Sequence, residues 1–144
     1  MRMRNTIFSL TGISILIGIL IFSCQPNVSI KTAQYAVNGQ KLYVTHCQSC
    51  HGSKGEGLGM LYPPLTDSAY LTENREKLAC IVKNGMTGPV EIHGKTYESD
   101  MPGNTELTNI DIAYILTYIT TTFGNDVETY TQEEVKSSLT DCGM

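Results

Sequence analysis

Apolar residues recur at the three-and-four spacing of an amphipathic helix in four segments of this chain. The strongest segment covers 108–123, where apolar positions extend so far round the helix that most of it should be buried. The other three cover 35–46, 72–84 and 131–139. Residues 89–97 alternate over a short stretch around the pair His93-Gly94, which predicts a small β-hairpin. The pattern therefore predicts a mainly helical domain with one hairpin.

Capping residues mark the ends of these helices. The segment 72–84 is expected to start at Thr72 and to end at Gly85. Two later helices each begin with a capping box, which pairs Thr108 with Asp111 and Thr131 with Glu134.

The first 23 residues have the composition of a secretory signal. Arg2 and Arg4 precede an apolar run over 7–22, whose 16 residues are fewer than the roughly 17–25 of a membrane span. The run ends in Ile21-Phe22-Ser23-Cys24, which resembles a bacterial lipobox with an unusually bulky Phe22. Cys24 would then carry the lipid and become the first residue. An uncleaved signal anchor is the alternative.

This interpretation divides the chain into a signal peptide at 1–23, a polar, lipidated tether at 24–35 and a domain at 36–144. We therefore expect a protein of the cell envelope, on the periplasmic side, anchored to a membrane by lipid.

Charge excludes one class of partner. The chain has 14 acidic and 10 basic residues, and loss of Arg2 and Arg4 with the signal would leave a net charge of −6. Nucleic-acid binding needs clusters of Lys and Arg, so no nucleic-acid partner is expected. An acidic surface favours either a partner with a basic patch or simple solubility.

The stretch Cys47-Gln48-Ser49-Cys50-His51 has the spacing of a c-type haem attachment motif. Two thiols on one turn can each add to a porphyrin vinyl group, and the adjacent imidazole can bind the iron. A thioredoxin-like motif would be expected near a βαβ pattern, and none is visible. A zinc site would need a second pair of ligands, and only His46 lies close by.

The segment after the motif is expected to line the haem. Residues 52–59 contain four glycines, which allow the backbone to approach a flat macrocycle, and they do not form the Gly-x-x-x-x-Gly-Lys-Ser/Thr pattern of a phosphate-binding loop. Pro63 and Pro64 then stiffen the chain. A carbonyl oxygen in this stretch can accept a hydrogen bond from Nδ1 of His51 and fix its tautomer.

The chain resembles the class I cytochromes c over about 36–139. The resemblance rests on the haem motif, Pro63-Pro64-Leu65, Asn84-Gly85-Met86-Thr87-Gly88-Pro89, Gly94-Lys95-Thr96-Tyr97, Met101-Pro102 and the helix around Tyr114 to Ile119. It implies an all-α fold of helices around one covalently bound haem c. The first and last helices of that fold would cross where Gly39 and Tyr43 meet Tyr114 or Tyr118. Pro63 and Pro64 would lie in the haem pocket.

The resemblance also implies the second iron ligand. In this family the methionine of a Met-Pro pair at the place of Met101 binds the iron opposite the histidine. His93 would give a bis-histidine centre, but a solvated residue at the hairpin tip is the better interpretation. Met86 would need a different loop path, and Met60 follows His51 too closely.

Cys80 and Cys142 are not required by the family pattern. Assigning Cys24 to lipid and Cys47 and Cys50 to haem leaves these two cysteines in an oxidising compartment, which predicts a disulfide between them. Two free thiols or an intermolecular bond are the alternatives.

Together these features predict a membrane-anchored monohaem cytochrome c that carries single electrons between respiratory redox proteins and is not itself an enzyme. A cytochrome subunit of a dehydrogenase or reductase complex is one alternative. A haem with an open sixth position for catalysis or gas binding is another.

Overall fold

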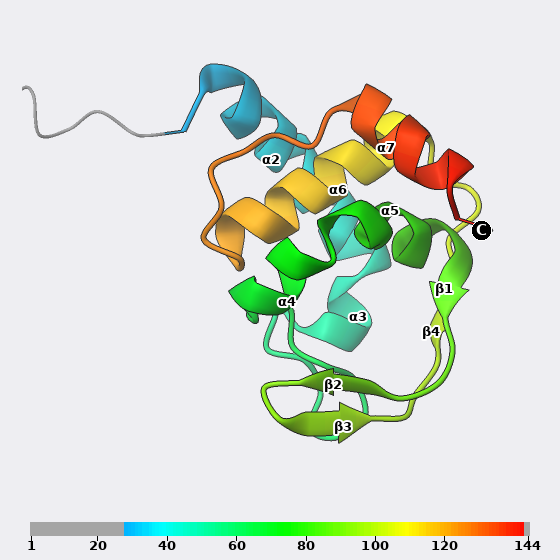
Figure 1. Cartoon of the computed structure of the whole chain (residues 1–144). Coiled ribbons are helices and arrows are strands. Elements are labelled where there is room, and N and C mark those ends of the chain that lie inside the picture. The colour runs from blue at the N-terminus through cyan, green and yellow to red at the C-terminus, as the bar shows by residue number, and fades with distance from the viewer. Residues whose placement is uncertain (1–27, 143–144) are drawn as a thin grey trace, which may run out of the picture.

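The structure, a computed structural model, describes residues 28–142. Its six helices and four short strands follow one another along the chain (Figure 1). They are α2 (Ile30–His46), α3 (Gln48–His51), α4 (Ser68–Glu73), α5 (Arg75–Asn84), β1 (Gly85–Met86), β2 (Val90–Ile92), β3 (Lys95–Tyr97), β4 (Met101–Pro102), α6 (Asn109–Thr122) and α7 (Gln132–Thr140). Within this described part, no helix is both long and apolar enough to cross a membrane.

The first helix begins earlier than the apolar pattern predicts. Ser29 caps α2 by accepting a hydrogen bond from the backbone N–H of Thr32 at 3.0 Å. The Thr32 hydroxyl is buried and lies 2.6 Å from that of Thr129, so this turn is fixed by a distant segment. Residues 30–35, which the sequence pattern assigned to the tether, are therefore part of α2.

The predicted helix over 72–84 is two helices. Asp67 caps α4 through a hydrogen bond from the N–H of Tyr70, five residues before the expected start at Thr72. Asn74 leaves the helical conformation at φ −106° and ψ 14°, and its side-chain amide donates to the carbonyl of Tyr70. The predicted end is confirmed, because Gly85 follows α5 at φ 83°.

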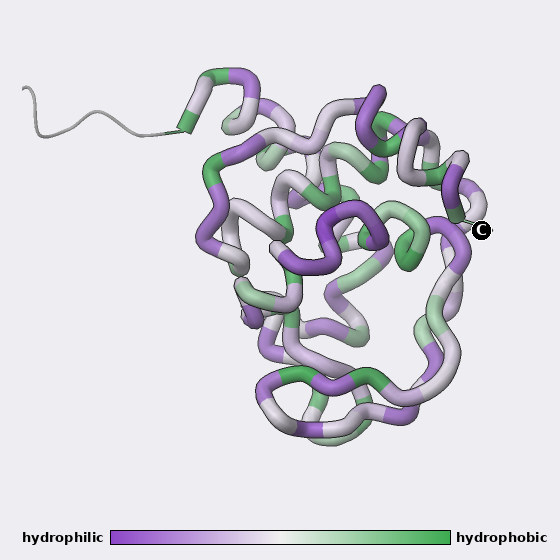
Figure 2. The backbone as a smooth tube through the Cα atoms, in the orientation of Figure 1, coloured by the Kyte–Doolittle hydropathy of each residue, from purple (hydrophilic) through white to green (hydrophobic). Residues whose placement is uncertain are grey.

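The strands form two antiparallel pairs. β2 and β3 make the predicted hairpin around His93 and Gly94, and Figure 2 shows hydropathy alternating along β2. The sequence pattern missed the second pair, in which β1 joins β4 with Gly85 opposite Pro102 and Met86 opposite Met101. At Gly85 a Cβ atom would lie 2.4 Å from the Met101 carbonyl oxygen, so only glycine allows this approach.

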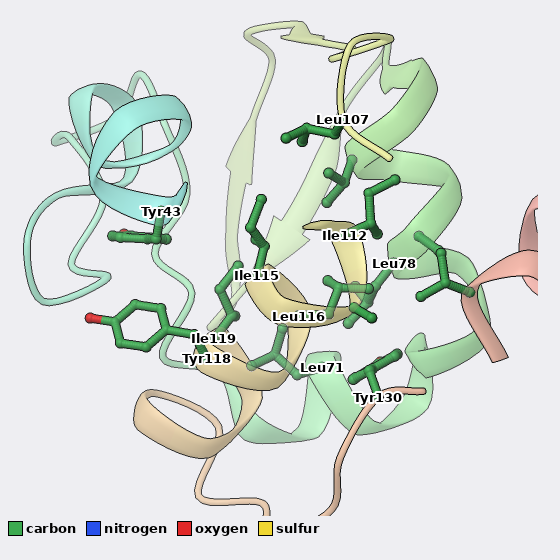
Figure 3. Packing of buried hydrophobic residues seen from close by; sticks show 14 residues of the cluster. Tyr43, Leu71, Leu78, Leu107, Ile112, Ile115, Leu116, Tyr118, Ile119 and Tyr130 are labelled. Atoms are coloured by element: carbon green, nitrogen blue, oxygen red, sulfur yellow. The ribbon is translucent and has the colours of Figure 1, made fainter. Parts of the chain in front are cut away.

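The predicted crossing of α2 and α6 is present. A Cβ atom on Gly39 would lie 1.9 Å from the Tyr114 carbonyl oxygen, which shows how closely the two backbones approach. The rings of Tyr43 and Tyr118 are 5.2 Å apart at this crossing (Figure 3). Buried side chains of α6 continue from there into the core: Ile112, Ala113, Ile115, Leu116 and Ile119.

The last helix is attached to α5 by charge, packing and a disulfide. The predicted capping box of Thr131 and Glu134 is present. The Arg75 guanidinium donates to Glu134 at 2.9 Å and lies 3.9 Å from the centre of the Tyr130 ring. Cys80 and Cys142 form a disulfide with Cα atoms 5.7 Å apart.

Candidate haem site

The attachment motif lies on one turn of helix at the end of α2. Cys47 ends α2 and begins α3, and its carbonyl accepts hydrogen bonds from the N–H groups of Cys50 and His51 at 3.2 and 3.0 Å. Spacings of three and four residues bring the two thiols and the imidazole to one side of the turn. Both cysteines are half-buried and unpaired. Burial, followed by the charge of Cys50, raises the pKa of the Cys47 thiol to about 11.

The His51 side chain is buried and oriented by a backbone carbonyl. Its Nδ1 lies 3.0 Å from the Pro63 carbonyl oxygen, as the sequence predicted. Since a carbonyl only accepts, Nδ1 carries the proton and Nε2 is left with a free lone pair. Burial lowers the pKa of the imidazole, while the bond to Pro63 acts in the opposite direction. The neutral ring is the form that binds a metal.

The glycine-rich loop brings the Pro63 carbonyl to His51. Gly57 has φ 73°, and a Cβ atom there would lie 2.5 Å from the Tyr62 carbonyl oxygen. The Leu65 N–H donates to the Gly55 carbonyl at 2.8 Å, and the Tyr43 hydroxyl donates to the Gly52 carbonyl at 2.6 Å. These contacts fold the loop back onto the motif.

An apolar pocket opens beside His51. The space between its walls, part of it open to solvent, has a volume of about 730 Å³. The haem-site residues that line it include Cys47, His51, Pro63, Pro64 and Met101. Cys50 lines an adjoining cavity together with Cys47, His51 and Met101. The predicted haem-site residues therefore converge on one region.

Sequence reasoning missed the place of Met86. The β1–β4 register sets Met86 directly opposite Met101, and both side chains line the pocket with His51. Directly paired residues of a ladder project to the same face, so the two thioethers are neighbours. No local signal indicates this, because the pairing joins segments 15 residues apart. Apolar residues of α5 and α6, expected only as core, also line the pocket: Leu78, Ile81, Val82, Leu116 and Ile119.

The other candidate ligands do not line this pocket, although His46 lines the adjoining cavity. His93 is about half exposed, and its Nδ1 is 3.5 Å from an Asp67 carboxylate oxygen. Met60 is 62 % exposed. His46 is exposed and lies 3.2 Å from the side-chain amide of Asn104. Within residues 28–142 no three His, Cys, Asp or Glu side chains gather as a metal-binding group, as the zinc alternative would require.

The chain belongs to the cytochrome c family, whose model, described as Cytochrome c, matches residues 36–123. It is 30% identical over 110 residues to a cytochrome c-552 of Thermus thermophilus, an alignment covering 69% of this chain and 82% of that one. It is 31% identical over 92 residues to the cytochrome c subunit of a quinone alcohol dehydrogenase from Gluconacetobacter polyoxogenes. That alignment covers 62% of this chain and 19% of the subunit. Membership confirms the all-α fold with its short strands and implies covalently bound haem c.

The residues present fit that cofactor. Two half-buried thiols and a buried, correctly oriented imidazole adjoin a pocket whose walls are mostly aliphatic, as a largely apolar macrocycle requires. Met86 and Met101, which line the same pocket, carry soft thioether sulfurs of the type that binds iron in cytochromes c.

Proposed function

We propose that this chain is a membrane-anchored monohaem cytochrome c that carries single electrons between redox proteins of the cell envelope. Cys47 and Cys50 attach the haem, and His51 and Met101 bind its iron. The observation that carries the proposal is the pocket itself. His51, held by Pro63, and Met101, held by the β1–β4 ladder, line one apolar cavity beside Cys47.

The haem and the residues around it contribute to electron transfer in different ways. Haem c supplies an iron that gains or loses one electron without any bond being made in a substrate. The Pro63 carbonyl holds the His51 proton on Nδ1 and so leaves Nε2 available. The aliphatic walls of the pocket limit water, and a thioether ligand in such surroundings favours the reduced iron, which raises the potential.

Ligand substitution tests the assignment, with Met86 as a matched control on the paired strand. We expect ferric Met101→Ala to lose the weak red absorption band typical of sulfur ligation and to become high-spin. It should also bind added imidazole, and its potential should fall. Met86→Ala should retain the band. The assignment to Met101 is wrong if the two variants behave the other way round, and a wild-type protein without the band would favour the open-site alternative.

The membrane anchor is the second part of the proposal. Cys24 and the signal at 1–23 lie outside the described residues, and the support is the lipobox-like sequence. A radiolabelled fatty acid should be incorporated into the wild-type protein and not into Cys24→Ala. Labelling of neither protein would instead favour an uncleaved apolar anchor.

A permanent enzyme partner is the second candidate function. It is favoured by the similarity to cytochrome c subunits of quinone alcohol dehydrogenases from Gluconacetobacter polyoxogenes and Komagataeibacter europaeus. In that case this cytochrome should co-purify from detergent extracts in a fixed ratio with a dehydrogenase. A free carrier should separate from every partner at moderate salt, because docking then depends on exposed charges.

A further inference from the structure

The outward face of α2 carries exposed aliphatic residues between its polar ones. Thr32, Gly39 and Tyr43 point into the protein. On the opposite side Ile30, Val37 and Val44 are 81 %, 57 % and 54 % exposed. These three residues are seven apart, and seven residues return to within about 20° of the same direction on a helix. We call Ile30, Val37 and Val44 the α2 stripe. Gln34 and Lys41 lie on the same face between these residues, so apolar and polar side chains alternate along it.

The charge around the stripe is unlike the charge of the rest of the chain. All 14 acidic residues lie at or after Glu56, so α2 contains none. Lys31 and Lys41 are exposed on this helix, and Lys41 lies four residues after Val37, on the same face. Apolar side chains accompanied by lysines and free of acids are the composition of a helix that lies in a lipid–water interface. The acidic remainder of the chain would be repelled by anionic headgroups.

The position of the stripe brings it to a bilayer. Ile30 follows Cys24 by six residues, a length of chain that spans at most about 20 Å. The N-terminal end of α2 projects from the body of the molecule (Figure 1). Three aliphatic residues would bind lipid weakly on their own. A tether this short makes the second contact intramolecular and greatly raises its effective concentration.

We infer that α2 lies along the membrane surface with the α2 stripe in the headgroup region and Lys31 and Lys41 beside the lipid phosphates. The inference rests on the proposed anchoring at Cys24 and adds a fixed orientation to it. The β2–β3 hairpin lies at the end of the molecule remote from the start of α2 (Figure 1). A redox partner would then meet a domain held in one orientation rather than one swinging on a tether.

A spin label at the stripe tests this orientation on the full-length, haem-loaded protein. Val37→Cys places the label on the stripe, and Lys136→Cys, exposed on α7, is the matched control. Both are bound to vesicles of phosphatidylethanolamine and phosphatidylglycerol. We expect the label at 37 to collide several-fold more with oxygen than with a water-soluble nickel chelate, and the label at 136 to show the reverse.

Fatty-acid labelling of the same preparations separates this inference from the proposed anchor. If Cys24 carries lipid and the label at 37 still collides mainly with nickel, the orientation is overturned while the anchor stands. If Cys24 carries no lipid and the label at 37 reports lipid, the anchor is wrong and the orientation stands. If Cys24 carries no lipid and the label at 37 collides mainly with nickel, both the anchor and the orientation are wrong. Strong dipolar broadening between labels at 37 would overturn the inference in favour of a second copy of this chain on the stripe.

Discussion

Gly39 determines how closely the two longest helices approach. Its position on α2 faces the backbone of α6, and the nearest α6 atom would lie 1.9 Å from a Cβ atom placed there. The Tyr35 and Tyr114 rings meet edge to face, 4.7 Å apart, beside this contact. Because backbone rather than a flexible side chain fills the space, α6 cannot yield locally to a methyl group.

We predict that Gly39→Ala destabilises the protein by about 1–3 kcal/mol, as overpacked core variants do. This loss is expected although alanine is about 1 kcal/mol better than glycine inside a helix. Asn38→Ala, at the exposed neighbouring position, should change the free energy of unfolding by less than about 0.5 kcal/mol. Guanidinium unfolding followed by circular dichroism measures both. A Gly39→Ala variant as stable as wild type would mean that the helices are not in this contact.

At the level of elements, the position of Met101 depends on α5. Lys83 donates from Nζ to the carbonyls of Thr105 and Leu107 at 2.7 Å each, and so holds the segment that follows β4. Gly103 is also in close contact with the end of α5, where a Cβ atom would lie 2.4 Å from the Asn84 carbonyl carbon. Together with the β1–β4 ladder, these contacts fix both sides of Met101.

We predict that Lys83→Met weakens the methionine ligation. Loss of the two hydrogen bonds should destabilise the local structure that holds Met101 by about 1–2 kcal/mol. Added imidazole should therefore displace Met101 more easily and bind the ferric protein roughly tenfold more tightly. The red sulfur band should also disappear at a lower temperature on heating. Lys77→Met removes the same charge from an exposed position on α5 and should change neither property. Equal effects of the two substitutions would show that the change in net charge is responsible, and not the loss of the two hydrogen bonds from Lys83.

Local signals predicted some elements and not others. The starts of α6 and α7 could be predicted because Thr108 with Asp111, and Thr131 with Glu134, are three residues apart. The first turn of α2 could not, because the burial of Thr32 depends on Thr129. The β1–β4 pair was missed because each strand is two residues long and has no pattern of its own.

The candidate site likewise contains residues that local sequence predicts and residues whose place depends on long-range pairing. Cys47, Cys50 and His51 form a contiguous motif. A rigid carbonyl that orients the histidine could be inferred from Pro63 and Pro64, which follow this motif in the sequence. The pairing of Met86 with Met101 is long-range, so the sequence placed Met86 on a separate path.

At the scale of the whole molecule, the pocket takes the place of much of the core. Helices α3, α4, α5 and α6 and three of the strands contribute walls to it, and these apolar walls would otherwise be exposed to water or collapse. We predict that Cys47→Ser combined with Cys50→Ser abolishes covalent haem and lowers helical content. Acid–acetone extraction followed by pyridine haemochrome spectra measures the first effect, and circular dichroism measures the second. A double variant with wild-type helicity would show that the polypeptide folds without the cofactor.

The disulfide joins two parts of the chain that are 62 residues apart, and α7 has other attachments that bear on its contribution. Val135 is fully buried, and the Arg75 guanidinium contacts Glu134 and Asp126 at 2.9 and 3.0 Å. These contacts should keep α7 in place without the disulfide, so its main effect is to restrict the unfolded chain. The chain-entropy model gives about 4 kcal/mol for a loop of this size, which is an upper value.

We therefore predict that Cys80→Ser combined with Cys142→Ser lowers the free energy of unfolding by about 2–4 kcal/mol and leaves the haem spectrum unchanged. The spectrum should persist because Cys80 faces α7, whereas its neighbours Ile81 and Val82 line the pocket. Intact mass should rise by two hydrogens when the denatured wild-type protein is reduced, and the double variant should show no rise. Thr131→Ala, which removes only the cap of α7, should cost about 1 kcal/mol. A double-serine variant no less stable than Thr131→Ala would mean that the disulfide adds little beyond the packing of α7.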